Sequence, residues 1–140
     1  MKSLADAVME AWRGPVRECA PGVLETEFLF SAGCPVFSGH FPGKPILPGV
    51  AQITAAACTA GRGELLPVRR IERCKFLRPV LPGETIRVRA EVKAEVGARA
   101  GTDACKDGGR REGLRVNVRL FVGEENCASM TLVLAETGQS

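Results

Sequence analysis

Polar and apolar residues alternate along two stretches in the second half of the chain. Within residues 84–96 every second side chain is apolar and most of those between are charged. Residues 114–122 repeat this pattern, and a turn at 123–126 leads into a last predicted strand, 127–135. Because successive side chains of a strand point to opposite faces, the alternating stretches predict antiparallel strands with one buried face.

Three further strands are predicted before these. Residues 16–19 and 23–30 are separated by Pro21-Gly22, a pair typical of turns. Residues 69–77 form the third, which ends before a segment rich in proline and glycine. The residues 97–113 are rich in glycine and charge, which predicts a hairpin end rather than a further element.

Two helices are predicted. Residues 2–12 form a short one, with Ser3 as N-cap and Gly14-Pro15 as its end. The second covers 49–60, opened by Pro48 and followed by Gly61 at the C-cap position. This helix has no charge and no polar face, so we expect it to be covered on all sides.

One buried helix and five or six antiparallel strands predict an α+β fold in which the sheet wraps the helix. The 140 residues suit one domain, 1–140, with residues 1–14 as an N-terminal helical extension. The opening residues carry acids within their apolar stretch, so we do not expect a signal peptide. No window reaches 18 uninterrupted apolar residues, so no transmembrane helix is expected.

Composition narrows the function classes. The net charge of +3 is mild, and six Phe, one Trp and no Tyr argue against a nucleic-acid partner. One His and no C-x-x-C pair argue against a metal site. The six cysteines are irregularly spaced, so we expect free thiols in a reducing cytoplasm.

Positive charge is concentrated in residues 62–78. The ordinary interpretation is a solvent-exposed face, and the alternative is a binding surface for an acidic partner or a phosphate group. The residues considered for this role are Arg69, Arg70, Arg73, Lys75 and Arg78.

The single histidine, His40, lies in a shaped loop. Residues 38–50 contain three prolines and three glycines, which restrict the backbone at some positions and free it at others. An imidazole titrates near neutral pH and is therefore suited to proton transfer. A histidine without a catalytic role is the ordinary alternative.

Two motifs resemble those of a known family. Residues 39–50 have the sequence GHFPGKPILPGV and residues 73–84 have the sequence RCKFLRPVLPGE. They resemble the two signatures of the β-hydroxyacyl-acyl carrier protein dehydratases of bacterial fatty acid synthesis. The resemblance covers about residues 15–136. It implies the hotdog fold, an antiparallel sheet around a central helix, in dimers or larger assemblies with sites at the subunit interface.

The resemblance also implies a reaction. Water leaves a β-hydroxyacyl thioester, carried on the phosphopantetheine of acyl carrier protein or of CoA, to give an enoyl thioester. His40 matches the histidine that moves the proton, and the amide of Gly49 matches the group that polarises the thioester carbonyl. Phe41, Val50 and Ile53 would line the acyl tunnel. No further cofactor, metal or membrane is implied.

One position departs from the family. Thr54 stands where the family has a glutamate on the helix, and Cys58 where it has a glutamine. A hydroxyl cannot act as a general acid near neutral pH. Three explanations stay open. His40 serves both proton transfers, with Thr54 holding a water; another carboxylate, among Glu64, Asp6 and Glu10, takes the role; or a hetero-partner of the same fold supplies the acid.

Two other functions stay open. A non-catalytic subunit that binds acyl carrier protein or completes a heterodimer explains Thr54 directly. A hotdog thioesterase would share the ligand but needs a base for water. Under the dehydratase interpretation, the basic residues listed above would dock an acidic carrier protein.

Overall fold

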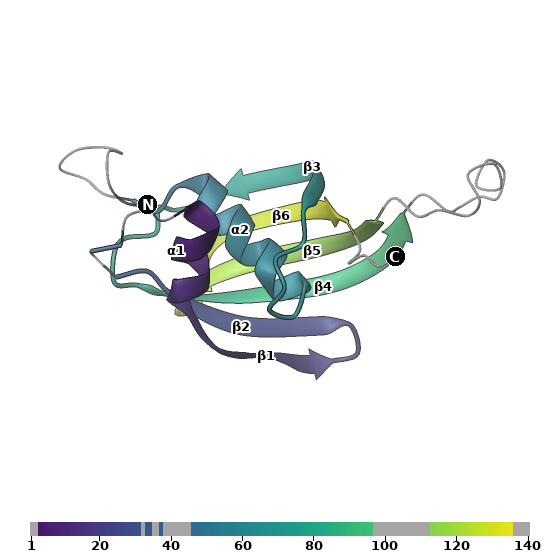
Figure 1. Ribbon diagram of the computed structural model, residues 1–140, viewed down its shortest axis with the longest axis horizontal. Coiled ribbons are helices and arrows are strands. Elements are labelled where there is room, and N and C mark those ends of the chain that lie inside the picture. The colour runs from purple at the N-terminus through teal and green to yellow at the C-terminus, as the bar shows by residue number, and fades with distance from the viewer. Residues whose placement is uncertain (1–2, 32, 35–36, 38–45, 97–112, 136–140) are drawn as a thin grey trace, which may run out of the picture.

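The computed structural model describes residues 3–31, 33–34, 37, 46–96 and 113–135. They form one six-stranded antiparallel sheet with two helices (Figure 1). The strands are β1 (Trp12–Ala20), β2 (Val23–Leu29), β3 (Val68–Phe76), β4 (Thr85–Val96), β5 (Gly113–Val122) and β6 (Glu125–Leu134). The helices are α1 (Leu4–Ala11) and α2 (Gly49–Ala60). The predicted elements are thus confirmed, with ends shifted by a few residues.

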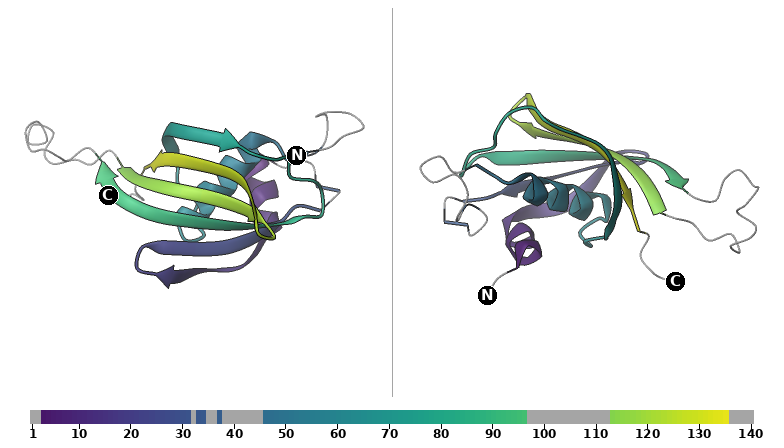
Figure 2. Two further views of the ribbon diagram at one scale, coloured as in Figure 1. Left: turned by 180° about the vertical axis from the view of Figure 1, so that it is seen from behind. Right: turned by 90° about the horizontal axis from the view of Figure 1, so that it is seen from above.

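The strand order is β1-β2-β4-β5-β6-β3, so β1 and β3 are the two edges. The sheet curves around α2, and both helices lie on the same side of it (Figure 2). The largest fully buried side chains come mainly from the strands, among them Leu24, Phe28, Ile86, Leu120 and Leu132. This arrangement is the predicted α+β fold, with the core between sheet and helices.

The alternation of apolar residues placed the strand faces correctly. Leu24, Thr26 and Phe28 of β2 are buried, whereas Glu25 is only partly buried and Glu27 is exposed. Ile86, Val88 and Ala90 of β4 have no exposed surface. The alternation of apolar and polar residues is therefore enough to predict which face of each strand is buried.

Helix α1 begins where the sequence predicted. The Ser3 hydroxyl accepts a hydrogen bond from the Asp6 amide, and the Asp6 carboxylate accepts one from the Ser3 amide. This reciprocal capping box satisfies two amides at the helix start. The helix then packs on α2, where the Cys58 thiol donates to the Met9 sulfur at 3.5 Å.

The predicted end of this helix at Gly14-Pro15 is wrong. Helix α1 ends at Ala11, and Trp12 already belongs to β1. The Trp12 indole donates to the Thr26 hydroxyl at 3.0 Å, which ties the chain to β2. Gly14, with φ of 84°, and Pro15 lie inside β1. An edge strand accommodates them because it tolerates a missing amide hydrogen and irregular pairing.

Helix α2 has the predicted bounds, Gly49–Ala60, and Gly61 is its C-cap. The chain then turns through Arg62 and Gly63, both with positive φ. Neither α1 nor α2 is long and apolar enough to cross a membrane, among the described residues.

Candidate active site

The first turn of α2 presents unbonded amide groups. Pro48 is the N-cap, with extended backbone, and no side chain caps the helix. The Pro48 carbonyl accepts from the amides of Ala51 and Gln52. Among the described residues, the amides of Gly49 and Val50 have no acceptor. No acidic side chain occupies this turn, so the positive end of the helix dipole is free to polarise an oxygen atom.

Phe76 closes one side of this helix end. A β-carbon built on Gly49 would lie 2.7 Å from the ring carbon Cζ of Phe76, so only glycine lets the ring approach so closely. The end of β3 and the first turn of α2 are neighbours in Figure 1. Phe76 remains 48% exposed. The ring therefore forms an apolar wall beside the two unbonded amides.

One stripe of α2 is uncovered, contrary to the expectation that the helix is covered on all sides. Val50, Ile53 and Thr54 share a face because they are three and four residues apart. Val50 is 55% exposed, and Ile53 and Thr54 are partly buried. The opposite face, including Ala51 and Ala55, is fully buried. The stripe begins at the unbonded amides.

Thr54 does not provide an acid. Its hydroxyl donates to the Val50 carbonyl at 2.8 Å, within the same helix. The oxygen can still accept a hydrogen bond from a water or a substrate hydroxyl. Cys58 faces α1 instead of this stripe, and burial raises the pKa of its thiol to about 11. Neither residue supplies a proton at neutral pH.

The three carboxylates considered as substitutes have other positions. The Asp6 carboxylate accepts the hydrogen bond from the Ser3 amide that caps α1. Glu64 follows the far end of α2, beyond Gly61. Glu10 lines a separate hollow at α1, together with Arg13 and Ser31. No hydrogen bond joins any of the three to Thr54 in the described parts of the chain.

His40 and Phe41 lie outside the described residues. Their predicted roles, general base and tunnel lining, stay predictions. The described chain resumes at Ile46, and the Leu47 amide donates to the Val80 carbonyl at 2.8 Å. This bond joins the two motif segments, 39–50 and 73–84, just before α2 begins.

Comparisons with known proteins agree with this geometry. The family model described as "ApeI-like: ApeI dehydratase" matches residues 17–105, which is more than half of the chain. The chain belongs to the ApeI-like dehydratase family.

Curated relatives are similar too. A 3-hydroxyacyl-[acyl-carrier-protein] dehydratase FabZ of Alkaliphilus metalliredigens is 37% identical over 115 residues, covering 75% of this chain and 68% of the relative. The FabZ of Acetivibrio thermocellus is 47% identical over 66 residues, covering 41% of this chain and 45% of the relative.

Solved structures have the same fold. The dehydratase heterocomplex ApeI:P from Xenorhabdus doucetiae matches with a TM-score of 0.57 and 22% identity, covering 89% of this chain and all of that one. The PaaI protein of E. coli matches with a TM-score of 0.57 and 13% identity, covering 86% of this chain and 81% of that one. At these identities the likeness shows the fold, and the hotdog fold predicted from the resemblance is confirmed.

In this ApeI-like chain the basic cluster of residues 69–78 divides into two groups. Arg70 binds Glu72 at 3.0 Å, and Arg78 binds Glu84 at 3.1 Å. Arg78 braces a turn, because Glu84 also accepts from the Leu81 amide. These hydrogen bonds hold the pKa of Glu84 below its ordinary value.

Arg73 and Lys75 form the other group. They line a hollow on the outer face of the sheet and have no carboxylate partner among the described residues. Arg69 is exposed near one end of β3. The carrier-docking role of the five residues stays a prediction. Of these five, Arg69, Arg73 and Lys75 have no ion pair among the described residues.

Two residues of interest were missed by sequence reasoning. Phe76 belonged to the second motif, but its contact with Gly49 depends on how β3 meets α2. Gln52 is 97% buried on α2, and its amide nitrogen donates to the Leu47 carbonyl at 3.4 Å. Its Oε1 has no hydrogen-bond partner among the described residues. One polar residue in an otherwise apolar helix gives no sign in the sequence that its side chain is buried.

Proposed function

We propose that this protein is a β-hydroxyacyl thioester dehydratase, which removes water to form an enoyl thioester and catalyses the reverse hydration. Membership of the ApeI-like dehydratase family supports this proposal most strongly. The start of α2 supports it further, because two unbonded amides lie beside an uncovered apolar stripe. A thioester has a polar carbonyl and an apolar chain, and this site offers a surface for each.

The site residues have the following proposed roles. The thioester carbonyl accepts hydrogen bonds from the amides of Gly49 and Val50, which stabilise the negative charge that develops when the α-proton leaves. His40 takes that proton as general base. The acyl chain lies along Val50 and Ile53 with Phe41 as a further wall. The β-hydroxyl then departs as water once it receives a proton.

The second proton transfer has no donor in the described part of this chain. General acid–base assistance contributes roughly 10²–10⁴ in rate, so its loss would slow dehydration severely. We propose that a second hotdog chain supplies the carboxylic acid across an interface, with Thr54 holding the leaving hydroxyl or a water. A solved structure of the same fold is described as the dehydratase heterocomplex ApeI:P, and this description supports a hetero-partner.

The surface around the start of α2 supports such an interface. Four large apolar side chains there are between 44% and 55% exposed. They are Val50, Phe76, Leu77 and Leu81. β3 is also an edge strand, whose unpaired backbone groups are available to another strand. A homodimer would cover the same surface but would repeat Thr54 in both sites.

A non-catalytic subunit is the second candidate, favoured by the hydroxyl of Thr54 in place of an acid. It would bind the acyl carrier and complete the site of its partner. Such a subunit would still bind the thioester through the amides of Gly49 and Val50. Replacing its His40 would not change the turnover of the complex.

One assay separates these functions. Purified protein is mixed with a β-hydroxyacyl-CoA and with the matching carrier thioester, and enoyl thioester is followed by its ultraviolet absorbance. We expect slow turnover alone, a gain of about tenfold or more in Thr54→Glu, and none in Thr54→Gln, which has the same shape without the acid.

The controls distinguish the alternatives. His40→Ala removes the turnover of Thr54→Glu if His40 is the base. Co-expression with a hotdog chain that carries a helix glutamate restores turnover to the wild type if the acid comes from a partner. Full turnover of wild-type protein as a homodimer would rule out the partner proposal, and release of free thiol would indicate a thioesterase.

Further expectations remain part of the proposal. The carrier is acyl carrier protein or CoA, in fatty acid or polyketide synthesis, and no cofactor or metal takes part. The location is cytoplasmic, which accords with the free thiols of the described cysteines. Localising a tagged chain in its own cells tests the last point.

A further inference from the structure

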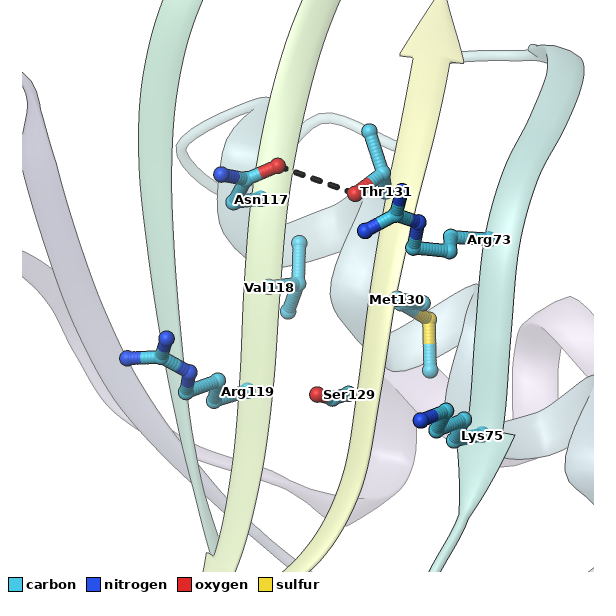
Figure 3. A pocket seen from close by; sticks show the side chains of 8 residues that line it. All are labelled: Arg73, Lys75, Asn117, Val118, Arg119, Ser129, Met130 and Thr131. Carbon is cyan, nitrogen blue, oxygen red and sulfur yellow. Dashed lines mark hydrogen bonds between the residues drawn. The ribbon is translucent and has the colours of Figure 1, made fainter.

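A hollow of about 230 Å³ lies on the outer face of the sheet, on the side opposite to α2. β3, β6 and β5 supply its walls and floor (Figure 3). Its polar lining consists of Arg73, Lys75, Asn117, Arg119, Ser129 and Thr131. The hollow is separated from the candidate active site by the sheet itself, so it is a different site.

The register of the strands assembles this lining in two rows. In one row Lys75 pairs with Ser129, which pairs with Arg119. In the next row Arg73 pairs with Thr131, and Thr131 with Asn117. Neighbouring strands lie roughly 4.8 Å apart, so cations on β3 and β5 flank the small residues of β6. Each row therefore has a floor of one hydroxyl with a cation on at least one side.

The directions of the side chains fit an anion. In Figure 3 Arg73 extends from β3 over β6 and Lys75 extends toward β6, while the guanidinium of Arg119 is directed toward β4. Among the described residues no partner holds Arg119, so rotation of its long side chain brings the guanidinium over Ser129.

The charges of the hollow are uncompensated. Several other cations of the sheet have carboxylate partners: Arg17, Arg87 and Arg89 share Glu25, Arg115 binds Glu72, and Lys93 binds Glu91. Among the described residues, Arg73, Lys75 and Arg119 have no carboxylate within 4.0 Å. Arg119 also stands directly opposite Arg89 on β4, a like-charge pair that is unfavourable.

The neutral groups add donors. The Thr131 hydroxyl donates to Asn117 Oδ1 at 3.0 Å, which leaves the Asn117 amide nitrogen free to donate. The Ser129 hydroxyl has no partner among the described residues. Three cations and two neutral donors around a compact floor match the several oxygens of a phosphate group, and charge-assisted bonds to such oxygens are the strong ones.

We propose that this hollow binds a phosphate group, held by Arg73, Lys75 and Arg119 over the hydroxyl of Ser129. The phosphate belongs either to a small phosphorylated ligand or to the phosphopantetheine of the thioester substrate. The second source rests on the proposed function, whereas the site itself does not.

The test is a titration of the full chain with inorganic phosphate at constant ionic strength, followed by amide chemical shifts. We expect saturable shifts at residues 117–119 and 129–131. The double variant Arg73→Gln/Lys75→Gln should weaken the affinity by roughly tenfold or more, since it removes two charge-assisted contacts. Ser129→Asp should abolish binding by placing a carboxylate in the floor.

A matched control removes the same charge elsewhere on the sheet. Arg17→Gln/Arg87→Gln takes two cations from Glu25, and it should leave the affinity within twofold. Equal weakening in both double variants would show attraction by net charge alone and would overturn the proposal, as would shifts that do not saturate. Unfolding midpoints in phosphate-free buffer show that each variant folds.

Two further probes identify the source. If 4′-phosphopantetheine binds more tightly than inorganic phosphate, and Arg73→Gln/Lys75→Gln weakens its affinity to the same extent, the phosphate comes from the phosphopantetheine arm of the thioester. If 4′-phosphopantetheine binds equally or more weakly than inorganic phosphate, the phosphate comes from a small phosphorylated ligand. If pantetheine without phosphate binds as well as 4′-phosphopantetheine, the proposal fails. These readouts need no turnover, so failure of the dehydratase assay leaves them unaffected.

Discussion

The ring of Phe76 lies against the backbone of Gly49, where a β-carbon would come within 2.7 Å of ring carbon Cζ. This contact places the end of β3 beside the first unbonded amides of α2. It links the two sequence motifs, since Gly49 belongs to one and Phe76 to the other.

Substituting Gly49→Ala should therefore reduce activity more than stability. The added methyl group displaces the half-exposed Phe76 ring, which can rotate toward solvent. The free energy of unfolding should therefore fall by only about 1 kcal/mol. Turnover should fall because the apolar wall leaves the carbonyl-binding amides. Steady-state kinetics and denaturant unfolding on the same samples measure the two effects.

A matched variant tests that explanation. Phe76→Leu in the Gly49→Ala background shortens the side chain and should recover part of the lost turnover. Lack of any recovery, with the fold intact, would show that the methyl group acts on the helix end and not through Phe76.

Arg78 should contribute to stability. Its guanidinium binds Glu84 at 3.1 Å and Glu125 at 3.5 Å, and Glu84 in turn accepts from the Leu81 amide. Arg78→Gln should lower the free energy of unfolding by about 1–2 kcal/mol, because a partly buried bidentate contact is lost. Arg78→Lys keeps the charge but lacks the planar guanidinium that makes two contacts, so it should lose less of the free energy of unfolding than Arg78→Gln. Urea denaturation curves provide the comparison, and unchanged stability in Arg78→Gln would contradict this role.

Glu72 should make stability depend on pH in the acid range. Hydrogen bonds from Arg115 and Arg70 lower the pKa of this carboxyl from 4.5 to about 2. Because the folded-state pKa is depressed, the contribution is fully present above about pH 4.5 and is lost as the pH falls toward 2. Glu72→Gln should flatten the pH profile of the unfolding midpoint in this window, with a small amplitude because the group is exposed to solvent. An unchanged slope would contradict the ion pair.

The cysteines should differ in reactivity. Burial raises the pKa of Cys58 to about 11 and that of Cys127 above its ordinary value, whereas Cys19 is exposed. A thiol reagent at mildly alkaline pH should modify Cys19 before Cys58 and Cys127, because the thiolate is the reactive form. Cys58 and Cys127 should react only when the chain unfolds. Peptide mass spectrometry after timed labelling measures the order, and early modification of Cys58 would mean that α1 does not stay on α2.

The elements of this fold were predictable because their signals are local. Alternation in residues 84–96 and 114–122 identified two strands and their buried faces, and the uncharged run after Pro48 identified α2 with its correct ends. The end of α1 was not predictable in this way. Trp12 leaves the helix because its indole bonds Thr26, which is distant in the sequence.

The fold class, the two family motifs and the threonine at the helix-acid position, Thr54, could all be predicted from residue types, because each depends on residues at neighbouring positions. The pairing of the cations, the uncovered stripe of α2 and the contact of Phe76 with Gly49 follow from the folded arrangement and had no signal in the sequence. Arg70 and Arg73 are three residues apart, yet one binds Glu72 and the other lines a hollow with residues of β5 and β6. The physical reason is that side-chain partners follow from strand register and helix packing, which join residues far apart along the chain.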